Sequence, residues 1–208
     1  MIKVQVLDHP LILDKLSRLR DKSAGTQQFR QLVHQVSTIL AVEATAHCQL
    51  SETTITTPFE PIIGHSLENE IVLLPILRAG LGMLGGFLDL LPDAKIGYLG
   101  VYRDETTLTP VTYYQNFPKS IAQAEIFVLD PMLATGGSAN YCISLIKSSG
   151  GKRITLVTIV SAPEGVTLIN RNHPDVKIVT ASLDRGLNGH GYIVPGLGDA
   201  GDRLNGTD

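Results

Sequence analysis

Residues 124–139 read Ala-Glu-Ile-Phe-Val-Leu-Asp-Pro-Met-Leu-Ala-Thr-Gly-Gly-Ser-Ala, and this stretch decides the fold. The apolar run at residues 126–129 predicts a buried strand, and Pro131 stops it because proline has no N–H group to donate. The glycines then lead into a helical pattern at residues 139–147. A strand, a glycine turn and a helix in this order gather unpaired N–H groups at the positive end of a helix dipole, which predicts an anion site.

The residues of the turn suit a phosphorylated sugar. Gly136 and Gly137 allow close backbone approach or a positive φ, and Thr135 and Ser138 add hydroxyl donors. Asp130 stands at the end of the strand, where a carboxylate can accept hydrogen bonds from sugar hydroxyls. The local pattern also fits a plain strand–turn–helix corner with Ser138 as the helix N-cap. A P-loop is excluded because no Lys-Ser or Lys-Thr pair follows the glycines.

A second strand–loop–helix pattern lies earlier in the chain. Residues 70–76 predict a central parallel strand, and residues 81–91 an amphipathic helix. Between them stand Arg78, Ala79 and Gly80. The planar donor fork of arginine suits a pyrophosphate, so we favour an anion-binding role for Arg78 over that of a solvated surface arginine.

The other segments alternate between strand and helix patterns. Strands are expected at 2–7, 96–101, 153–160 and 176–181, and helices at 10–19, 26–47 and 163–172. Leu11, Leu13, Leu16 and Leu19 are expected to form the apolar side of the first helix, and Thr26 to cap the second. The β-branched stretch 50–63 predicts an extended hairpin or arm, and residues 106–120 a long loop or hairpin. This alternation predicts an α/β fold with a doubly wound parallel sheet and ligands at the carboxyl ends of its strands.

The composition narrows the class of protein. A chain of 208 residues allows one domain with a full core, and a net charge of −3 argues against a nucleic-acid partner. The two cysteines, Cys48 and Cys142, do not make a disulfide framework, which fits a reducing cytoplasm. No signal-peptide pattern is visible, and the apolar stretch 71–92 contains an arginine that a bilayer would disfavour. We therefore expect a cytoplasmic protein without a membrane partner.

Residues 184–208 form a glycine-rich tail with neither a strand nor a helix period. A flexible linker would be poor in apolar residues, yet Ile193, Val194 and Leu197 occur here. We predict a folded cap of tight turns whose backbone amides contact something small and flat.

Four blocks together resemble the uracil phosphoribosyltransferase family over nearly the whole chain. They are residues 75–83 (PILRAGLGM), 101–103 (VYR), 128–138 (VLDPMLATGGS) and 191–202 (GYIVPGLGDAGD). The last block discriminates best, since other phosphoribosyltransferases share the loop for phosphoribosyl pyrophosphate (PRPP) but cap their base pockets differently. The resemblance implies one domain, residues 1–208, with a sheet of the phosphoribosyltransferase type, N-terminal helices, a β-arm and a C-terminal cap (hood) at 184–208 that binds uracil.

The resemblance also implies roles for individual residues. Arg78, Asp130 and Asp199 are the catalytic candidates. The implied PRPP site comprises Arg78, Arg103, Asp130, Pro131, Met132, Leu133, Ala134, Thr135, Gly136, Gly137, Ser138 and Asp199. The implied uracil site comprises Ile193, Gly198, Asp199, Ala200, Gly201, Asp202 and Arg203.

Three positions depart from the family pattern. Pro131 stands where many phosphoribosyltransferases carry a second acid, and Arg203 replaces a common lysine with retention of charge. Gly189 stands where a glutamate is common, so no role is carried over to it.

The implied reaction joins uracil to PRPP and gives UMP and pyrophosphate, the step of pyrimidine salvage. No dense carboxylate cage is apparent in the sequence, so Mg²⁺ is expected through PRPP and waters rather than through protein ligands. The family also implies a homodimer or larger homo-oligomer, and GTP as a candidate effector. Two alternatives stay open: an RNA-binding regulator on the same fold, which the net charge disfavours, and a purine enzyme, which the cap disfavours.

Overall fold

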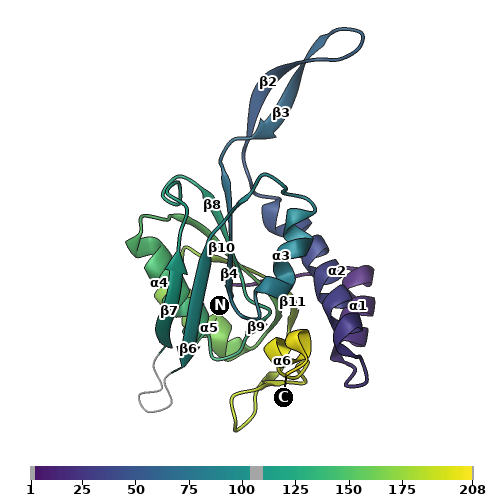
Figure 1. Ribbon diagram of the computed structural model, residues 1–208, viewed down its shortest axis with the longest axis vertical. Helices are drawn as coiled ribbons and strands as arrows, with labels where there is room; N and C mark the ends of the chain where they lie inside the picture. The colour runs from purple at the N-terminus through teal and green to yellow at the C-terminus, as the bar shows by residue number, and fades with distance from the viewer. Residues whose placement is uncertain (1–2, 104–109, 208) are drawn as a thin grey trace.

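The computed structural model describes residues 3–103 and 110–207. A mainly parallel sheet in the order β1-β11-β10-β8-β4-β6-β7 forms its centre (Figure 1). The strands of this sheet and the two short strands that join it are β1 (Gln5–Val6), β4 (Ile71–Leu77), β5 (Lys95–Ile96), β6 (Tyr98–Arg103), β7 (Pro110–Asn116), β8 (Glu125–Leu129), β9 (Met132–Leu133), β10 (Arg153–Ser161) and β11 (Lys177–Leu183). Within the described part of this sheet, neighbouring strands run parallel except β6 and β7, which form an antiparallel hairpin. The predicted loop or hairpin at 106–120 is therefore a hairpin where it is described, and residues 104–109 lie outside the described part.

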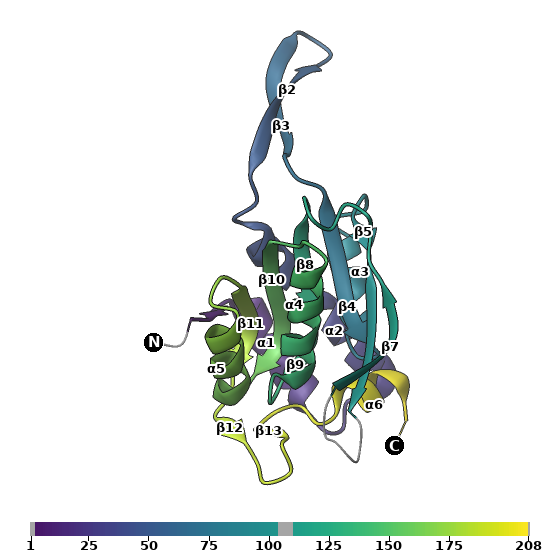
Figure 2. The same cartoon turned by 90° about the vertical axis from the view of Figure 1, so that its left-hand side faces the viewer.

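Helices cover both faces of the sheet, as the doubly wound pattern predicted. Figure 2 shows α4 (Gly137–Ser148) and α5 (Pro163–Asn172) in front of it, with α1 (Pro10–Arg20) and α2 (Thr26–Thr45) behind. α3 (Leu81–Leu88) packs beside α2. Strand β8 serves both cores, because Phe127 and Leu129 pack in the cluster with α1–α3 while Ile126 and Val128 pack in the cluster with α4 and α5. A strand buried on both faces reads as a continuous apolar run, which explains why this strand was visible in the sequence.

Two predictions about the N-terminal helices were wrong, namely the buried face of α1 and the cap of α2. Leu11 and Leu13 are about half exposed, and the buried face of α1 consists of Ile12, Leu16 and Leu19. Steps of four and three residues stay on one side of a helix, whereas residues 11 and 13 flank that side.

The N-cap of α2 is Gly25 in an extended conformation, without a side-chain cap bond, so Thr26 is the first helical residue and not the cap. The cap of α1 is His9, whose side chain accepts a hydrogen bond from the N–H of Leu11. None of the helices in residues 3–103 and 110–207 is both long and apolar enough to span a bilayer.

The predicted arm is confirmed as an antiparallel hairpin of β2 (Leu50–Thr56) and β3 (Pro61–Leu67). It projects far from the sheet, at the end of the molecule opposite the C-terminal segment (Figures 1 and 2). Large apolar side chains are exposed along it, and Phe59 at its turn is 96% exposed.

The C-terminal tail is folded, and besides the predicted turns it contains short strands and a helix that no pattern in the sequence indicated. A hairpin joins β12 (Gly186–Leu187) to β13 (Ile193–Val194), and α6 (Ala200–Asn205) follows. Asp199 caps α6 by accepting a hydrogen bond from the N–H of Asp202, and Gly206 ends the helix in a left-handed conformation. Elements of two and six residues are too short to show a period in the sequence.

Candidate active site

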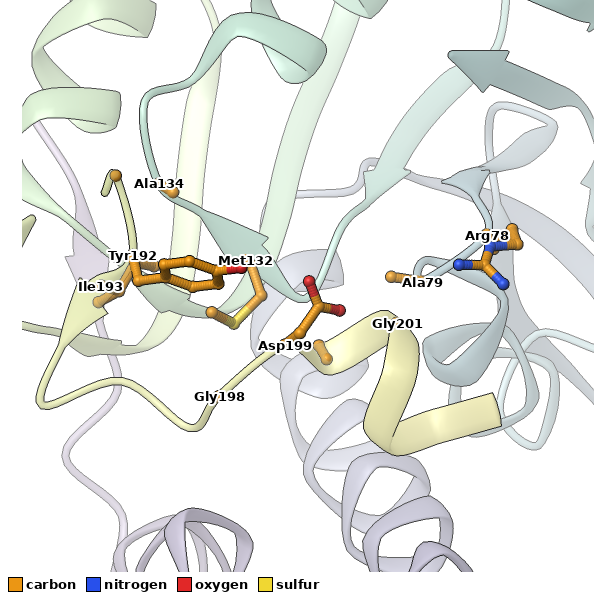
Figure 3. A pocket seen from close by; sticks show the side chains of 11 residues that line it. Arg78, Ala79, Met132, Ala134, Tyr192, Ile193, Gly198, Asp199 and Gly201 are labelled. Atoms are coloured by element: carbon orange, nitrogen blue, oxygen red, sulfur yellow. The ribbon is translucent and has the colours of Figure 1, made fainter. Parts of the chain in front are cut away.

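A cavity of about 340 Å³ opens where the carboxyl ends of the central strands meet the cap (Figure 3). Three separate segments build its wall: the turn after β4, the β9 region and the cap. Its lining residues are Arg78, Ala79, Met132, Ala134, Gly191, Tyr192, Ile193, Gly198, Asp199, Ala200 and Gly201. The two strand–loop–helix patterns and the glycine-rich tail thus converge on one place.

A smaller cavity of about 110 Å³ adjoins the first. It is lined by Asp130, Met132, Leu133, Ala134, Thr135, Gly136, Gly137, Ser138 and Ala139. Met132 and Ala134 line both cavities, so a ligand with two parts could occupy them together. We call residues 130–139 the anion loop and residues 184–207 the cap.

The anion loop presents the beginning of α4 to the small cavity. Gly136 has a φ of 83° and a Cβ there would lie 3.1 Å from the carbonyl oxygen of Gly165, so both conformation and space require glycine. A Cβ on Gly137 would meet only the Thr135 hydroxyl, at 3.8 Å, so this residue faces open space. The N-cap position is Gly136, and no side chain in the described residues caps this helix end. The alternative with Ser138 as the cap is therefore wrong, and the first N–H groups of α4 stay available for an anion.

Asp130 is half-buried and lines the small cavity. Burial raises the pKa of Asp130 to about 7, although the N–H of Met132, 3.5 Å from Oδ1, lowers it in part. In the described structure no cation pairs with this carboxyl group. A group in this state gains from ligand hydroxyls that donate to its charged form.

Arg78 and Asp199 both line the larger cavity. Figure 3 shows the carboxylate of Asp199 between Arg78 and Met132. The Arg78 side chain is 62% exposed, and its Nη2 lies 3.8 Å from Oδ1 of Asp202. Its guanidinium group is therefore free to move over the cavity, held by one weak ion pair.

Three residues of the sequence-derived sites line neither cavity. Pro131 is buried and its carbonyl accepts hydrogen bonds from the N–H groups of Ile159 and Val160 in β10. Asp202 does not line the cavity, but its Oδ1 lies 3.8 Å from Nη2 of Arg78 and its N–H donates to Asp199, and both of those residues line it.

Arg203 points away from the cavity, and its guanidinium group donates to the carbonyls of Leu19 and Leu197 at 2.7 Å. Arg103 is the last residue of β6, but its side chain lies outside the described residues.

Sequence reasoning assigned no role to two lining residues, Gly191 and Tyr192. The ring of Tyr192 lies beside Met132 in Figure 3, although its side chain is largely exposed. A large aromatic residue inside a glycine-rich segment was the available signal, since tyrosine combines a flat apolar face with a polar tip.

The fold defines a class of protein. The described structure superposes on a purine phosphoribosyltransferase from Pyrococcus horikoshii with a TM-score of 0.51 at 15% identity, covering 76% of this chain and 93% of that one. The chain thus has the phosphoribosyltransferase fold, with a mainly parallel central sheet.

Closer relatives identify the family. The sequence profile described as "Uracil phosphoribosyltransferase" matches residues 6–207. A uracil phosphoribosyltransferase of Finegoldia magna is 53% identical over the full length of both chains, and one of Thermosipho melanesiensis is 51% identical over 98% of each. A solved protein structure from Aquifex aeolicus superposes with a TM-score of 0.92 at 37% identity over 97% of each chain. The chain belongs to the uracil phosphoribosyltransferase family.

Proposed function

We propose that this chain transfers the phosphoribosyl group of PRPP to uracil, giving UMP and pyrophosphate in pyrimidine salvage. The observation that carries the proposal is the pair of adjoining cavities that share Met132 and Ala134. One is built around a free helix N-terminus, which suits a phosphate, and the other is bounded by backbone-rich cap segments, which suit a flat base. A ribose would bridge them. Membership in the family supports this assignment.

The anion loop would hold the 5′-phosphate and ribose of PRPP. The N–H groups at the start of α4 face the small cavity and, in the described residues, have no side-chain cap. Asp130 would accept hydrogen bonds from ribose hydroxyls, which favours its charged form and would lower its raised pKa on binding. Loop residues 131–138 complete the proposed PRPP site, with Pro131 acting through the backbone of β10 and not by direct contact.

Arg78, Asp130 and Asp199 would carry the chemistry. The bond between C1 of the ribose and pyrophosphate breaks as N1 of uracil bonds to C1, and positive charge develops on the sugar. The proton that N1 loses leaves with pyrophosphate or water. No covalent bond to the protein is required, so positioning and charge stabilisation are the main tasks. Arg78, together with Arg103, would offset the charge of the departing pyrophosphate. Asp199, which also lines the larger cavity, would orient the reactants.

The cap would read the base. Ile193, Gly198, Asp199, Ala200 and Gly201 all line the larger cavity, as a uracil site requires. Backbone N–H and C=O groups in such a segment can match the acceptor–donor–acceptor edge of uracil. We assign residues 184–208 to the same single domain as the rest of the chain, because the tail packs on α1 and α2 through hydrogen bonds.

Mg²⁺ would enter with PRPP. No group of three or more His, Cys, Asp or Glu side chains in the described residues is arranged to hold a metal ion. The donor set therefore fits a cation that takes most ligands from pyrophosphate and water, with Asp130 and Asp199 as the nearby carboxylates. Bound there, Mg²⁺ would neutralise charge on the leaving group.

A homodimer or larger homo-oligomer is the proposed assembly. The arm exposes Ile55, Phe59, Ile62 and Ile63, and an isolated two-stranded hairpin is marginal in water without a further surface to pack on. We also propose a cytoplasmic location. No contact in the described structure favours a GTP site, so GTP activation stays a prediction from the family.

The test is pyrophosphate release from PRPP and Mg²⁺ with uracil, cytosine, hypoxanthine and guanine side by side. Release with uracil alone supports the proposal. Release with hypoxanthine or guanine would favour the purine alternative and contradict the assigned base. Salt-dependent binding of RNA without any transfer would favour the regulator.

A further inference from the structure

The underside of the cap is attached to the two N-terminal helices by three arginines. Arg20 is the last residue of α1, Arg30 belongs to α2, and Arg203 belongs to α6 of the cap itself. Nε of Arg30 donates to the carbonyl of Leu204 at 2.6 Å. Each of these three guanidinium groups donates a hydrogen bond that joins the cap to the helical pair α1–α2.

Arg20 pairs with a buried carboxylate, that of Asp184. Its Nη1 and Nη2 donate to Oδ2 and Oδ1 of Asp184 at 2.7 and 2.6 Å, which is a bidentate pair. The Asp184 side chain is only 2% exposed. Nη2 also donates to the hydroxyl of Ser182, and that hydroxyl donates to Asp184. Bidentate pairs with buried carboxylates impose a defined geometry as well as energy.

The Arg20–Asp184 pair binds both backbone polar groups of Gly196, which lies in a turn of the cap. The N–H of Gly196 donates to Oδ2 of Asp184 at 2.8 Å, and its carbonyl accepts from Nη1 of Arg20 at 2.7 Å. Gly196 is buried, has a φ of 63°, and a Cβ there would lie 2.2 Å from the carbonyl oxygen of Ile193. The turn is thus tight, and its position fixes Ile193, which lines the larger cavity.

Arg203 binds Leu197, the residue that follows Gly196, and links it to α1. It donates to the carbonyl of Leu197 within the cap and to the carbonyls of Leu19 and Asp21 at the end of α1, all at 2.7 Å. The guanidinium carbon lies 4.2 Å from the ring centre of Phe29 in α2. Leu197 is followed directly by Gly198 and Asp199, which line the cavity.

We propose that the α1–α2 pair is the platform that positions the base-binding cap, with Arg20 as a positioning residue that acts through Asp184 and Gly196. The inference rests on the proposed function, because it assigns the cap to the base. It also gives Arg203 a positioning role instead of contact with uracil. The anion loop makes none of these contacts among the described residues, so the platform acts on one substrate and not on the other.

The test compares Arg20→Gln with Arg18→Gln. Arg18 lies two residues away on the same helix, is 62% exposed and pairs only with Asp14 in the described structure, so it controls for loss of charge on α1. Steady-state kinetics should give a KM for uracil raised roughly 10- to 100-fold in Arg20→Gln, since small misplacements of binding groups have effects of this size. The dissociation constant for PRPP, from calorimetry, should change less than about 2-fold. Arg20→Lys should recover part of the loss, and Arg18→Gln should match the wild type.

The ratio of kcat/KM for uracil over cytosine gives a second readout, and it should fall in Arg20→Gln because a displaced cap discriminates less well. An unchanged KM and an unchanged ratio in folded Arg20→Gln would overturn the inference. Equal losses for uracil and PRPP would also overturn it, because they indicate a general structural role. If Arg20→Gln does not fold, the same criteria apply to Asp184→Asn, which changes the other member of the pair. Failure of the wild type to use uracil would instead refute the proposed function.

Discussion

The anion loop and the cap adjoin at one edge of the sheet, but they are held in different ways. The anion loop directly follows β8 and leads into α4, so its neighbours in the chain fix its position. Strand β9, which lies within the loop, also pairs with β10. The cap is fixed by contacts to the N-terminal helices, such as Arg20 with Asp184 and Arg30 with Leu204, across 164 and 174 positions. One half of the site is local, and the other is assembled by tertiary structure.

Because of this difference, we expect the same change in the protein to affect the binding of uracil and the binding of PRPP unequally. The helix N-terminus that would bind phosphate exists as soon as β8 and α4 pack together. The cap contains short elements and exposed glycines, and it is joined to the rest of the chain by polar contacts to α1 and α2 and by four buried apolar residues, Ile193, Leu197, Ala200 and Leu204. Regions with few buried contacts of their own open more readily than core elements. Changes in α1 and α2 should therefore reach the base before they reach PRPP.

The largest expected effect tests whether the cap reads the base. Cytosine presents an amino group and a bare nitrogen where uracil presents an acceptor and a donor, so buried backbone groups of the cap would be left unpaired. Sites built to hydrogen-bond a substrate can reject such analogues by up to about 10⁴–10⁵ in kcat/KM. We expect a strong preference for uracil, measured with both bases at saturating PRPP. A small substituent such as fluorine at C5 should be tolerated.

Comparable efficiency with cytosine would contradict the contrast between the two regions, because the cap would then enclose the base without recognising its hydrogen-bonding edge. Phosphoribosyl transfer itself could still take place in that case. The outcome thus bears on the cap alone.

Arg78→Ala tests the residue that stands between the two regions. Its guanidinium group lines the larger cavity and approaches Asp202 of the cap. Loss of one donor that stabilises developing charge costs about 10²–10³ in rate, so kcat should fall by that amount while the affinity for uracil changes little. Arg18→Ala is a matched control, since that side chain is also 62% exposed and also pairs with an aspartate. Near wild-type kcat in Arg78→Ala would remove Arg78 from the leaving group.

Gly137→Val tests the local half of the site. A branched side chain would project toward the small cavity, where a Cβ meets only the Thr135 hydroxyl at 3.8 Å. Blocking one N–H bond to a charged phosphate should weaken PRPP binding by about 10- to 100-fold, from a loss of roughly 1.5–3 kcal/mol. Calorimetric titration with PRPP measures this, and circular dichroism should show an unchanged fold.

Two glycines sharpen that result. Gly189→Val lies in open space in the cap hairpin and should leave PRPP affinity unchanged. Gly136→Val should lower thermal stability instead, because its φ of 83° and its contact with Gly165 both oppose a side chain. Undiminished PRPP affinity in folded Gly137→Val would put the phosphate elsewhere.

The same difference explains what could be predicted from the sequence. Strands β4 and β8 were visible because burial on both faces leaves a continuous apolar run, and the glycine turn followed one of them directly. For the anion loop, the sequence left open whether the turn was an anion site or a plain corner with Ser138 as the N-cap of α4. These features depend on neighbouring residues and on periods that a helix or strand imposes.

The cap was less predictable for a physical reason. Helix α6 has only six residues, so no apolar period marks it, and its Asp199 cap and Gly206 end are each common in turns. The direction of Arg203 depends on carbonyls of Leu19 and Asp21, more than 180 positions away. Nothing near Arg203 in the sequence indicates those partners. The family resemblance located the cap but did not indicate what holds it.

The smallest expected effect contrasts a carboxyl group from each region. Burial raises the pKa of Asp130 to about 7. Burial also opposes ionisation of Asp184, but hydrogen bonds from Arg20, Ser182 and Gly196 outweigh it and lower the pKa of Asp184 below its usual 3.8. The folded protein therefore holds a proton on Asp130 more tightly than the unfolded chain does, and a proton on Asp184 less tightly. The two groups should give stability opposite dependences on pH.

For Asp130, stability should fall as pH rises from about 3.8 to about 7, because the unfolded chain releases its proton first. Asp130→Asn should therefore melt higher than the wild type above pH 7 and lose this advantage near pH 4. For Asp184, the stabilisation is present above pH 3.8 and is lost as pH falls through its lowered pKa. Asp184→Asn should melt lower than the wild type at pH 7, with a smaller difference in acid. Calorimetric melting of the three proteins without ligand, from about pH 2 to about pH 8, measures both slopes. Parallel slopes in the two variants would contradict the contrast, because they would mean that the anion loop and the cap hold their carboxylates by the same balance of burial and hydrogen bonding.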